Sequence, residues 1–172
     1  TRVRLDGCAE VSDSTVKAIV RHCPELELLD VSHCPLLEGA FADVMESGVS
    51  RQLHTLRMNG CHQLKDKNVH TMLLSGLPLE ALDLGGCPDC GPMTAQGLQI
   101  GGQLLRTLCL DSTAITTAAL KLALRGCRQL SELSVLRCEQ LHREVAFGIN
   151  FPQLPLLKRL SVGDHCACTA SP

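Results

Sequence analysis

The sequence predicts an α/β fold, a right-handed solenoid with a short parallel sheet on its concave side and helices on its convex side. Three observations predict it. A short apolar phrase recurs along the 172 residues at steps of 26, 27, 26, 26, 25 and 27 residues. Several of these phrases precede a helix-like stretch, and aromatic residues make up only 2% of the chain. A fixed period between 20 and 50 residues is typical of solenoids, in which each unit buries its apolar face against its neighbours.

The recurring phrase predicts a strand. Its residues alternate between apolar and polar over a few positions, which is the pattern of a strand with one buried face. Most phrases end in cysteine, at what we call the register position; Thr113 and His165 occupy that position in two repeats. The phrases span residues 3–8, 29–34, 56–61, 82–87, 108–113, 133–138 and 160–165, which makes six to seven repeats.

The stretch after a phrase predicts a helix. In the first repeat Ser12 or Asp13 is suited to cap the helix, and Pro24 prevents the helix from continuing far beyond that point. The third and fifth repeats show the same pattern over residues 64–78 and 115–127. The second repeat lacks the Ser/Thr-Asp start and the fourth has three extra residues around 88–92, so we expect local loops on the rim in both.

The closing signature Cys23-Pro24-Glu25-Leu26, with its counterpart Cys127-Arg128-Gln129-Leu130, adds to the strand phrase Leu-x-x-Leu-x-Leu-x-x-Cys. Together these motifs resemble the cysteine-containing leucine-rich repeats, and the resemblance covers the whole chain. It implies a single horseshoe-shaped repeat domain over residues 1–172. Many proteins with this repeat subtype are F-box substrate receptors of ubiquitin ligases, and others are scaffolds in large assemblies such as ciliary ones. The resemblance therefore implies one of these two roles.

The two ends of the chain carry their own expectations. The first residues contain neither a methionine nor the apolar core of a signal peptide, and they open directly on a strand phrase. We therefore expect a fragment of a longer intracellular protein, cytoplasmic or nuclear. The tail after residue 165 is short, so we expect the last repeat to end without a cap.

The spacing of the eleven cysteines favours packing over disulfides or metal binding. A small, weakly polar side chain at the register position fills the core and bonds to loop backbone groups, and Thr113 keeps that size. Cys87-x-x-Cys90 has the spacing of half a zinc site, but the other close pair, Cys166 and Cys168, lies three repeats away, about 14 Å at the spacing of stacked strands. A Zn–S bond of about 2.3 Å cannot join both pairs. We therefore expect no metal, no other cofactor and a reducing compartment.

The polar residues of the strand phrases predict a solvent-facing sheet surface, because alternate residues of a strand point to opposite faces. One row alternates in charge over its first four members, and opposite charges on neighbouring strands each contribute about 0.2–1 kcal/mol. Two interpretations stay open. In the first, the row is a ladder of ion pairs that neutralise one another; in the second, it is a recognition stripe whose charges pair with those of a partner. The candidate partner-binding residues are Arg4, Asp30, Arg57, Asn59, Asp83, Cys109, Asp111, Ser134 and Leu136.

The second half of this surface differs from the first. From Gly85 onward its rows are small or hydroxylic and end at Leu136, which we expect to be exposed, so a partner segment would approach the backbone closely there. Cys109 is the cysteine that we expect to face solvent on the sheet. Its neighbours Asp83 and Asp111 would raise its pKa, which predicts an ordinary, unreactive thiol.

Composition and motifs argue against other classes of function. A net charge of −2, with basic residues scattered among acids, argues against nucleic acid and anionic membranes. The sequence contains no phosphate-binding loop, nucleophile elbow or His-Glu-x-x-His motif, and its seven histidines share no repeat position. We therefore expect no enzyme activity and no small-molecule substrate, and a partner that is another protein or peptide segment.

Overall fold

The computed structural model describes residues 1–40, 51–141, 154–163 and 166–169. The strands of these residues form one sheet in chain order. Strands β1 to β7 run parallel, and β8 runs antiparallel to β7. The strands are β1 (Arg2–Arg4), β2 (Leu28–Asp30), β3 (Thr55–Arg57), β4 (Ala81–Asp83), β5 (Thr107–Cys109), β6 (Glu132–Leu136), β7 (Arg159–Gly163) and β8 (Cys166–Thr169).

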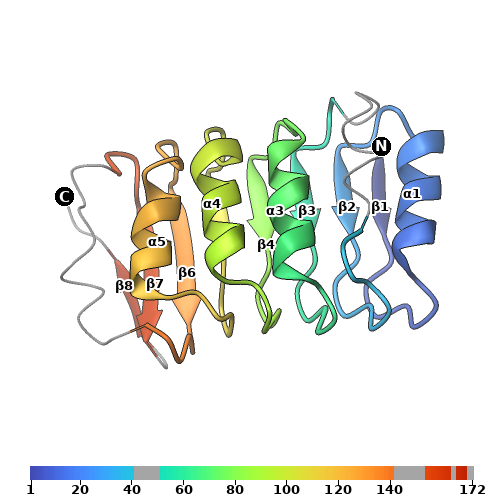
Figure 1. Cartoon of the computed structure of the whole chain (residues 1–172). Coiled ribbons are helices and arrows are strands. Elements are labelled where there is room, and N and C mark those ends of the chain that lie inside the picture. Colours follow the sequence, from blue (N-terminus) through green and yellow to red (C-terminus); the bar gives the residue numbers. More distant parts are fainter. Residues whose placement is uncertain (41–50, 142–153, 164–165, 170–172) are drawn as a thin grey trace.

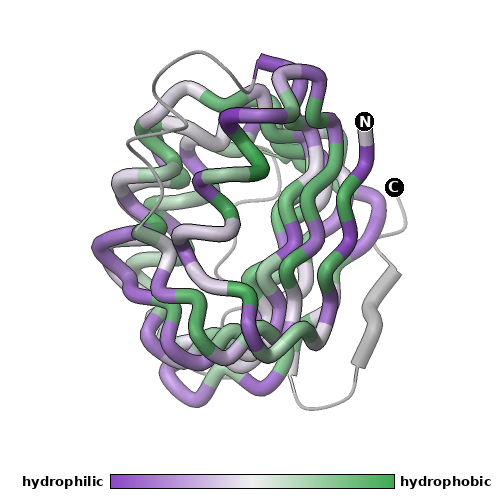
Figure 2. The backbone as a smooth tube through the Cα atoms, turned by 90° about the vertical axis from the view of Figure 1, so that its right-hand side faces the viewer, coloured by the Kyte–Doolittle hydropathy of each residue, from purple (hydrophilic) through white to green (hydrophobic). Residues whose placement is uncertain are grey.

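Helices cover one face of this sheet (Figure 1). Viewed along the stack, successive turns of the chain overlie one another, with strands on one side and helices on the other (Figure 2). This arrangement confirms the predicted α/β solenoid. The helices are α1 (Asp13–His22), α3 (Asp66–Leu74), α4 (Pro92–Gly101) and α5 (Thr117–Leu124). Within the described ranges no helix is long and apolar enough to cross a membrane. Residues 41–50, part of the stretch between the second and third phrases, lie outside those ranges.

A column of leucines holds the strands together. Leu29 pairs with Leu56, Leu56 with Leu82, Leu82 with Leu108 and Leu108 with Leu133, in the register that the period predicts. Each of these side chains is at most 1% exposed. Full burial of a leucine stabilises a fold by about 1.5–3 kcal/mol, so this column alone makes the register costly to shift.

Four of the thiols at the register position connect their repeat to the one before it. Each of the four donates to a carbonyl three residues before the register position of the preceding repeat. The bonds run from Cys34 Sγ to Leu5 O (3.3 Å), Cys61 Sγ to Val31 O (3.2 Å), Cys87 Sγ to Met58 O (3.1 Å) and Cys138 Sγ to Leu110 O (3.0 Å). Thr113 Oγ1 donates instead to Leu110 O of its own repeat, at 2.7 Å. The predicted role of a small buried polar group is confirmed, and the cysteines add a bond between repeats that the pattern did not reveal.

The residue before the register position turns the chain from the sheet toward the helices. It adopts a positive φ in six successive repeats, although only three of the six residues are glycine. The angles are 70° at Gly7, 55° at His33, 69° at Gly60, 69° at Gly86, 52° at Ser112 and 52° at Arg137. The left-handed conformation costs a residue with a Cβ atom about 1–2 kcal/mol, so the stack imposes this turn even where the residue type disfavours it.

Two aspartates at the starts of helices accept hydrogen bonds from the following repeat. Asp13, one of the two residues predicted to cap α1, instead accepts hydrogen bonds from the N–H groups of Gly39 (2.9 Å) and Ala40 (3.1 Å), and Ser12 is the N-cap residue. Asp66 accepts from the N–H groups of Gly91, Met93 and Thr94 at 2.7–2.9 Å, and from the Thr94 hydroxyl at 2.6 Å. These carboxylates satisfy the free N–H groups at the start of the next helix or its equivalent.

The C-terminal end of the sheet differs from expectation. β8 pairs antiparallel with β7, with Leu160 opposite Cys168 and Val162 opposite Cys166. The expectation that the last repeat ends without a cap is therefore wrong. An unpaired edge leaves backbone N–H and C=O groups without partners, and the tail reverses direction and pairs with that edge.

Replacing Cys61 with alanine should lower the free energy of unfolding by about 1–2 kcal/mol, because the Val31 carbonyl loses a buried donor and the side chain leaves a small void. Urea denaturation followed by circular dichroism measures this change. Cys8→Ala is the matched control, because Cys8 occupies the same register position but is exposed. We expect Cys8→Ala to change stability by less than about 0.5 kcal/mol. Equal losses in the two variants would contradict the role of the thiol bond.

Gly86→Ala should destabilise the chain more than Gly7→Ala. Both glycines have a φ near 70° and both substitutions incur the left-handed cost of about 1–2 kcal/mol. A Cβ atom on Gly86 would also lie 3.3 Å from the backbone N and Cα of Gly60, whereas one on Gly7 would meet nothing within 4 Å. Thermal denaturation of both variants measures the difference, and a larger loss for Gly7→Ala would show that crowding at Gly86 is absent.

Candidate interaction surface

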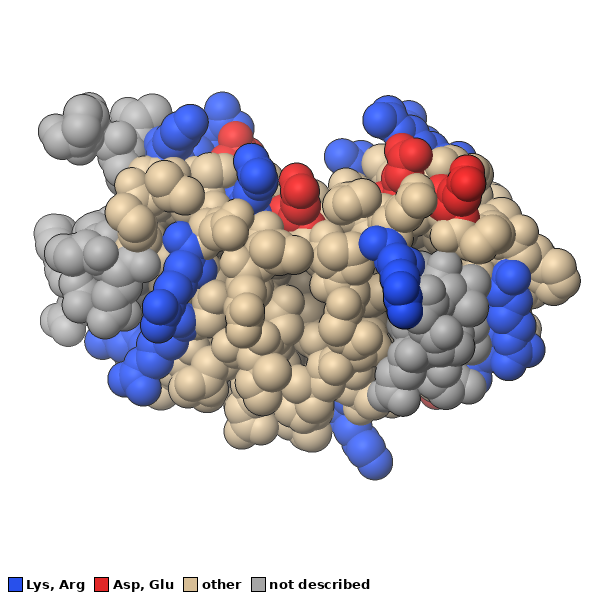
Figure 3. Space-filling model, turned by 90° about the horizontal axis from the view of Figure 1, so that it is seen from above, with Lys and Arg blue, Asp and Glu red and all other residues tan. Residues whose placement is uncertain are grey.

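The sheet face opposite the helices contains a hollow of about 420 Å³. Seen from above, the molecule is hollowed on one side, and acidic and basic side chains line both sides of the hollowed outline (Figure 3). Ion pairs between neighbouring repeats include Arg106–Glu80 at 3.5 Å and Arg159–Glu132 at 3.1 Å. The hollow itself is lined by Asp6, Asp30, Ser32, His33, Arg57, Asn59, Ala81, Leu82, Asp83, Thr107 and Cys109.

Five of the nine candidate residues line this hollow, namely Asp30, Arg57, Asn59, Asp83 and Cys109. Strand register places four of them side by side, because Asp30 pairs with Arg57, Arg57 with Asp83 and Asp83 with Cys109. The other four candidates lie outside the lining: Arg4 pairs with Asp30 at the end of the row, and Asp111, Ser134 and Leu136 lie beyond Cys109. The hollow thus lies over β2 to β5 and the loop after β1, whereas we expected a partner segment over the second half of the sheet.

Six lining residues are absent from the nine candidates. Four of them, Asp6, Ser32, Ala81 and Thr107, belong to the rows beside the charged row, which the strand pattern places on the same face of the sheet. Leu82 is a core residue that forms the floor, being 1% exposed. His33 reaches the hollow because its left-handed turn, which is unusual for histidine, lays its ring beside Gly60. The sequence gives no signal for that turn beyond its repeat position.

The charged row is only partly neutralised. Arg57 Nη1 lies 3.7 Å from Asp30 Oδ2, with side-chain exposures of 48% and 12%. The Ser32 N–H also donates to Asp30, at 3.2 Å. Arg4–Asp30 and Arg57–Asp83 are neighbours in register, but neither forms an ion pair in the described part of the chain. Of the three neighbouring pairs in the charged row, only Arg57–Asp30 forms the ion pair that the ladder interpretation requires. An ion pair this exposed contributes about 0–1 kcal/mol to stability.

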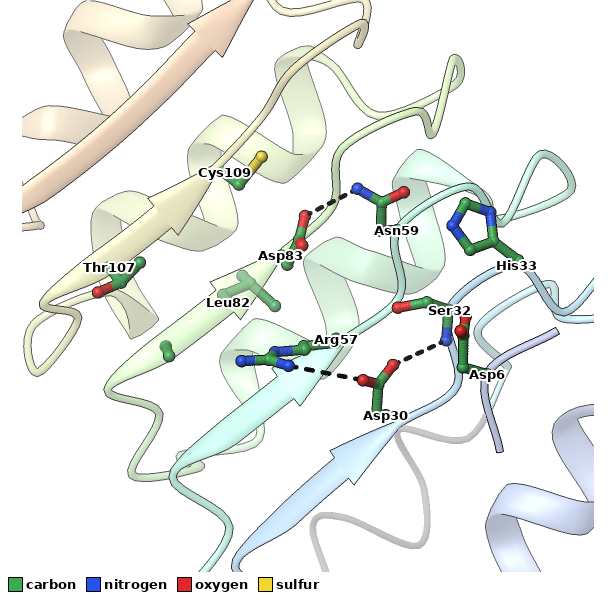
Figure 4. Close-up of a pocket in the computed structure, with 11 residues that line it drawn as sticks. Asp6, Asp30, Ser32, His33, Arg57, Asn59, Leu82, Asp83, Thr107 and Cys109 are labelled. Atoms are coloured by element: carbon green, nitrogen blue, oxygen red, sulfur yellow. Dashed lines mark hydrogen bonds and ion pairs between the residues drawn. The ribbon is translucent and has the colours of Figure 1, made fainter. Parts of the chain in front are cut away.

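Asp83 is held by neutral donors. The Gly85 N–H donates to Oδ1 at 3.0 Å, and Asn59 Nδ2 donates to the same oxygen at 3.5 Å (Figure 4). A hydrogen bond to the backbone two residues ahead is a common local arrangement for aspartate at the end of a strand. These bonds orient the carboxylate without supplying a positive charge.

Asp111 fixes the next part of the surface. It accepts hydrogen bonds from the Ser134 hydroxyl at 2.6 Å and from the Leu136 N–H at 2.7 Å. This carboxylate therefore joins the ends of β5 and β6. The Leu136 side chain is half-buried, so it is less exposed than we expected. Pairing of β6 with β7 along Leu136 accounts for its partial burial.

The pKa of the Cys109 thiol is raised, as predicted. Burial is the largest cause, because it disfavours the thiolate. The charges of Asp83 and Asp111 raise the pKa further, and a hydrogen bond with the Asp83 side chain acts in the same direction. Sequence reasoning named the two aspartates but not burial. A nucleophilic cysteine needs the opposite shift, so Cys109 is poorly suited to covalent chemistry.

The other thiols whose side chains the structure describes are mostly buried. Cys87 and Cys90 are buried, and the pKa of Cys87 is raised by its hydrogen bond with Cys90 and by burial. Burial raises the pKa of Cys61 and of Cys127, each to about 12. Within the described residues no group of three or more His, Cys, Asp or Glu side chains has the geometry of a metal site.

Comparison with known proteins agrees with the fold. No protein-family model matches the sequence. A chain in the crystal structure of the Rad7 and Elc1 complex in yeast has a similar structure, with a TM-score of 0.74 and 19% sequence identity. The match covers 93% of this chain but 42% of that chain, so this chain spans less than half the length of its structural neighbour. At this identity the similarity shows a shared fold.

Cys109 should resist alkylation by iodoacetamide at pH 7.5. An unperturbed thiol has a pKa of about 8.5, and a raised pKa keeps Cys109 protonated at pH values where such a thiol ionises. Its alkylation should therefore require more alkaline conditions than that of exposed Cys8. Asp83→Asn removes one charge that raises the pKa and should speed the reaction. Peptide mapping by mass spectrometry measures both rates, with Asp89→Asn in the exposed loop as control. Equal rates for Cys8 and Cys109 in the folded chain would contradict the shift.

Proposed function

We propose that this chain is a non-catalytic protein–protein interaction module that binds a partner polypeptide on the concave face of its sheet. The observation that carries the proposal is the hollow over β2 to β5 and the loop after β1, whose polar lining faces away from the core. Seven strands in one hydrogen-bonded register give that lining a fixed geometry. A pre-organised surface binds with a smaller loss of conformational entropy than a mobile one does.

The composition of the surface favours a polypeptide partner. Carboxylates, an arginine, an amide and apolar floor residues lie together in the hollow. Nucleic acid requires a predominantly basic face, and the lining contains three aspartates and one arginine. The structural neighbour is itself part of a complex between two proteins, which agrees with an interaction role for this fold.

Two specific roles fit this module. The first is substrate recognition in an F-box type ubiquitin ligase, and its support is the resemblance of the repeats to those of F-box proteins. The second is a scaffold subunit of a large assembly. The register thiols donate their hydrogen bonds in the reduced state, which supports a reducing, intracellular location for either role. A helical F-box segment in the full-length protein would favour the first role, and a further repeat array or coiled coil would favour the second.

Substitutions on the two faces should separate a concave interface from a convex one. Arg57→Glu and Leu136→Asp each change the concave face, and Lys121→Glu changes an exposed position on α5. We expect both concave variants to change the amounts of captured partners, and the α5 variant to capture them as the unmodified chain does, because binding at an interface centred on the sheet depends on the charge there. Affinity capture with quantitative mass spectrometry gives the comparison, after thermal denaturation has shown that each variant is folded. Loss of the same partners by Lys121→Glu alone would assign the interface to the helices.

A further inference from the structure

We infer that the concave hollow accepts a lysine or arginine side chain of an extended partner segment, and that this side chain pairs with Asp83. The inference rests on the proposed function, because it names the chemistry of the partner at the same surface. It assigns one carboxylate as the anchor and predicts the charge that the partner must present. Four steps lead to it: the balance of charge, the environment of Asp83, the access to Asp83 and the shape of the floor.

The charge of the hollow is unbalanced toward the acidic side. Its lining contains Asp6, Asp30 and Asp83 but only one arginine, Arg57. Figure 4 shows the Arg57 guanidinium directed at Asp30, and the two groups form the ion pair at 3.7 Å. Arg57 is also the cross-strand neighbour of Asp83, yet it forms no ion pair with it. A partner that enters this hollow therefore meets an acidic surface.

Asp83 is the carboxylate best placed to bind a cation. It is half-buried, and its contacts are neutral: the Gly85 N–H at 3.0 Å, the Asn59 amide at 3.5 Å and the adjacent Cys109 thiol. Among the described residues no cationic group pairs with it. A carboxylate that is oriented by neutral donors and partly removed from water gains more from a counter-ion than a fully exposed one does.

Asp83 is accessible from the hollow, because it is half-buried and belongs to the lining. Gly85 is buried, and a Cβ atom there would lie 3.2 Å from Asp83 Oδ1, 3.1 Å from Cys109 Sγ and 2.8 Å from Asn59 Nδ2. The glycine therefore lets Asn59 and Cys109 pack close to the carboxylate, and Figure 4 shows these two side chains on either side of Asp83.

The floor of the hollow suits the stem of a long basic side chain. Ala81 lies on the same face of β4 as Asp83, two residues and about 7 Å before it. Leu82 and Thr107 also line this part of the hollow. Lysine and arginine side chains lay their methylene groups along apolar surface and keep the charged end at a polar group. Such a side chain would lie over Ala81 and Thr107 with its charge at Asp83.

A hollow that spans several strands also has room for the segment that carries this side chain. Neighbouring strands are about 4.8 Å apart, so the lining from β2 to β5 extends about 14 Å. This length corresponds to about four residues of extended chain. A single metal ion would occupy only a small part of this length. Among the described residues there is also no group of three or more His, Cys, Asp or Glu side chains that could hold one.

The test uses the whole chain and a phage-displayed library of random 12-residue peptides. Peptides selected on the unmodified chain are synthesised, together with analogues in which each basic residue is replaced by norleucine or citrulline. Fluorescence anisotropy then gives the dissociation constants for the unmodified chain, Asp83→Asn, Arg57→Gln and the loop control Asp89→Asn. Circular dichroism and thermal denaturation verify that each variant is folded. Asp83→Asn keeps the shape of the side chain and its ability to accept from Gly85.

We expect the selected peptides to share one basic residue, and the neutral analogue to bind at least about tenfold more weakly. Asp83→Asn should weaken the binding of the basic peptide by a similar factor and leave the affinity for the neutral analogue nearly unchanged. This difference is the coupling that a double-mutant cycle measures. Arg57→Gln should strengthen binding about threefold, because it removes the competing cation from the hollow. Asp89→Asn should leave both affinities unchanged.

Other outcomes would overturn the inference. Selected peptides without a basic residue, no selected peptide at all, or coupling to Asp83 below about twofold would each reject it. Acidic peptides that depend on Arg57 would reject the predicted charge but keep the concave face as an interface, so the proposed function would stand. Basic peptides that couple to Asp83, combined with cellular partners insensitive to Arg57→Glu and Leu136→Asp, would instead support the site and reject the proposed function.

Discussion

The parallel register between neighbouring strands is the constraint on which the rest of this structure depends. It places equivalent residues of adjacent repeats side by side, and every contact between repeats described above follows from it. Register thiols bond to carbonyls 28 to 30 residues earlier, and Asp66 bonds to groups 25 to 28 residues later. A slip of one residue would turn the leucine column toward solvent and break these bonds together.

The same register creates the concave surface. Where a position of the repeat varies, its residues form a row of different side chains, one on each strand. The binding properties of this face therefore depend on the differences between repeats. Asp30, Arg57, Asp83 and Cys109 occupy one row, and their differences determine where charge is balanced. The buried column behind them is uniform, because its leucines have the same packing role in each repeat.

The period of the phrases made the fold, the strand register and the neighbours in each row predictable. Properties that depend on a choice between equivalent neighbours were not predictable. Arg57 lies between Asp30 and Asp83 in register, and the sequence does not indicate which of the two it contacts. In the structure the conformation of its side chain directs it to Asp30. His33 enters the hollow through a left-handed turn that histidine disfavours. β8 depends on a chain reversal near the end of the sheet, where the period no longer applies.

Asp13 and Asp66 form hydrogen bonds with the following repeat, so a structural unit of this solenoid does not coincide with one sequence repeat. By sequence each carboxylate belongs to one repeat, but its hydrogen bonds lie at the start of the next one. A junction placed in the return loop between a helix and the next strand would separate each carboxylate from its partners. Exchange of repeats between related solenoids should therefore preserve a module that runs from the start of one helix to the first turn of the next, such as residues 66–94.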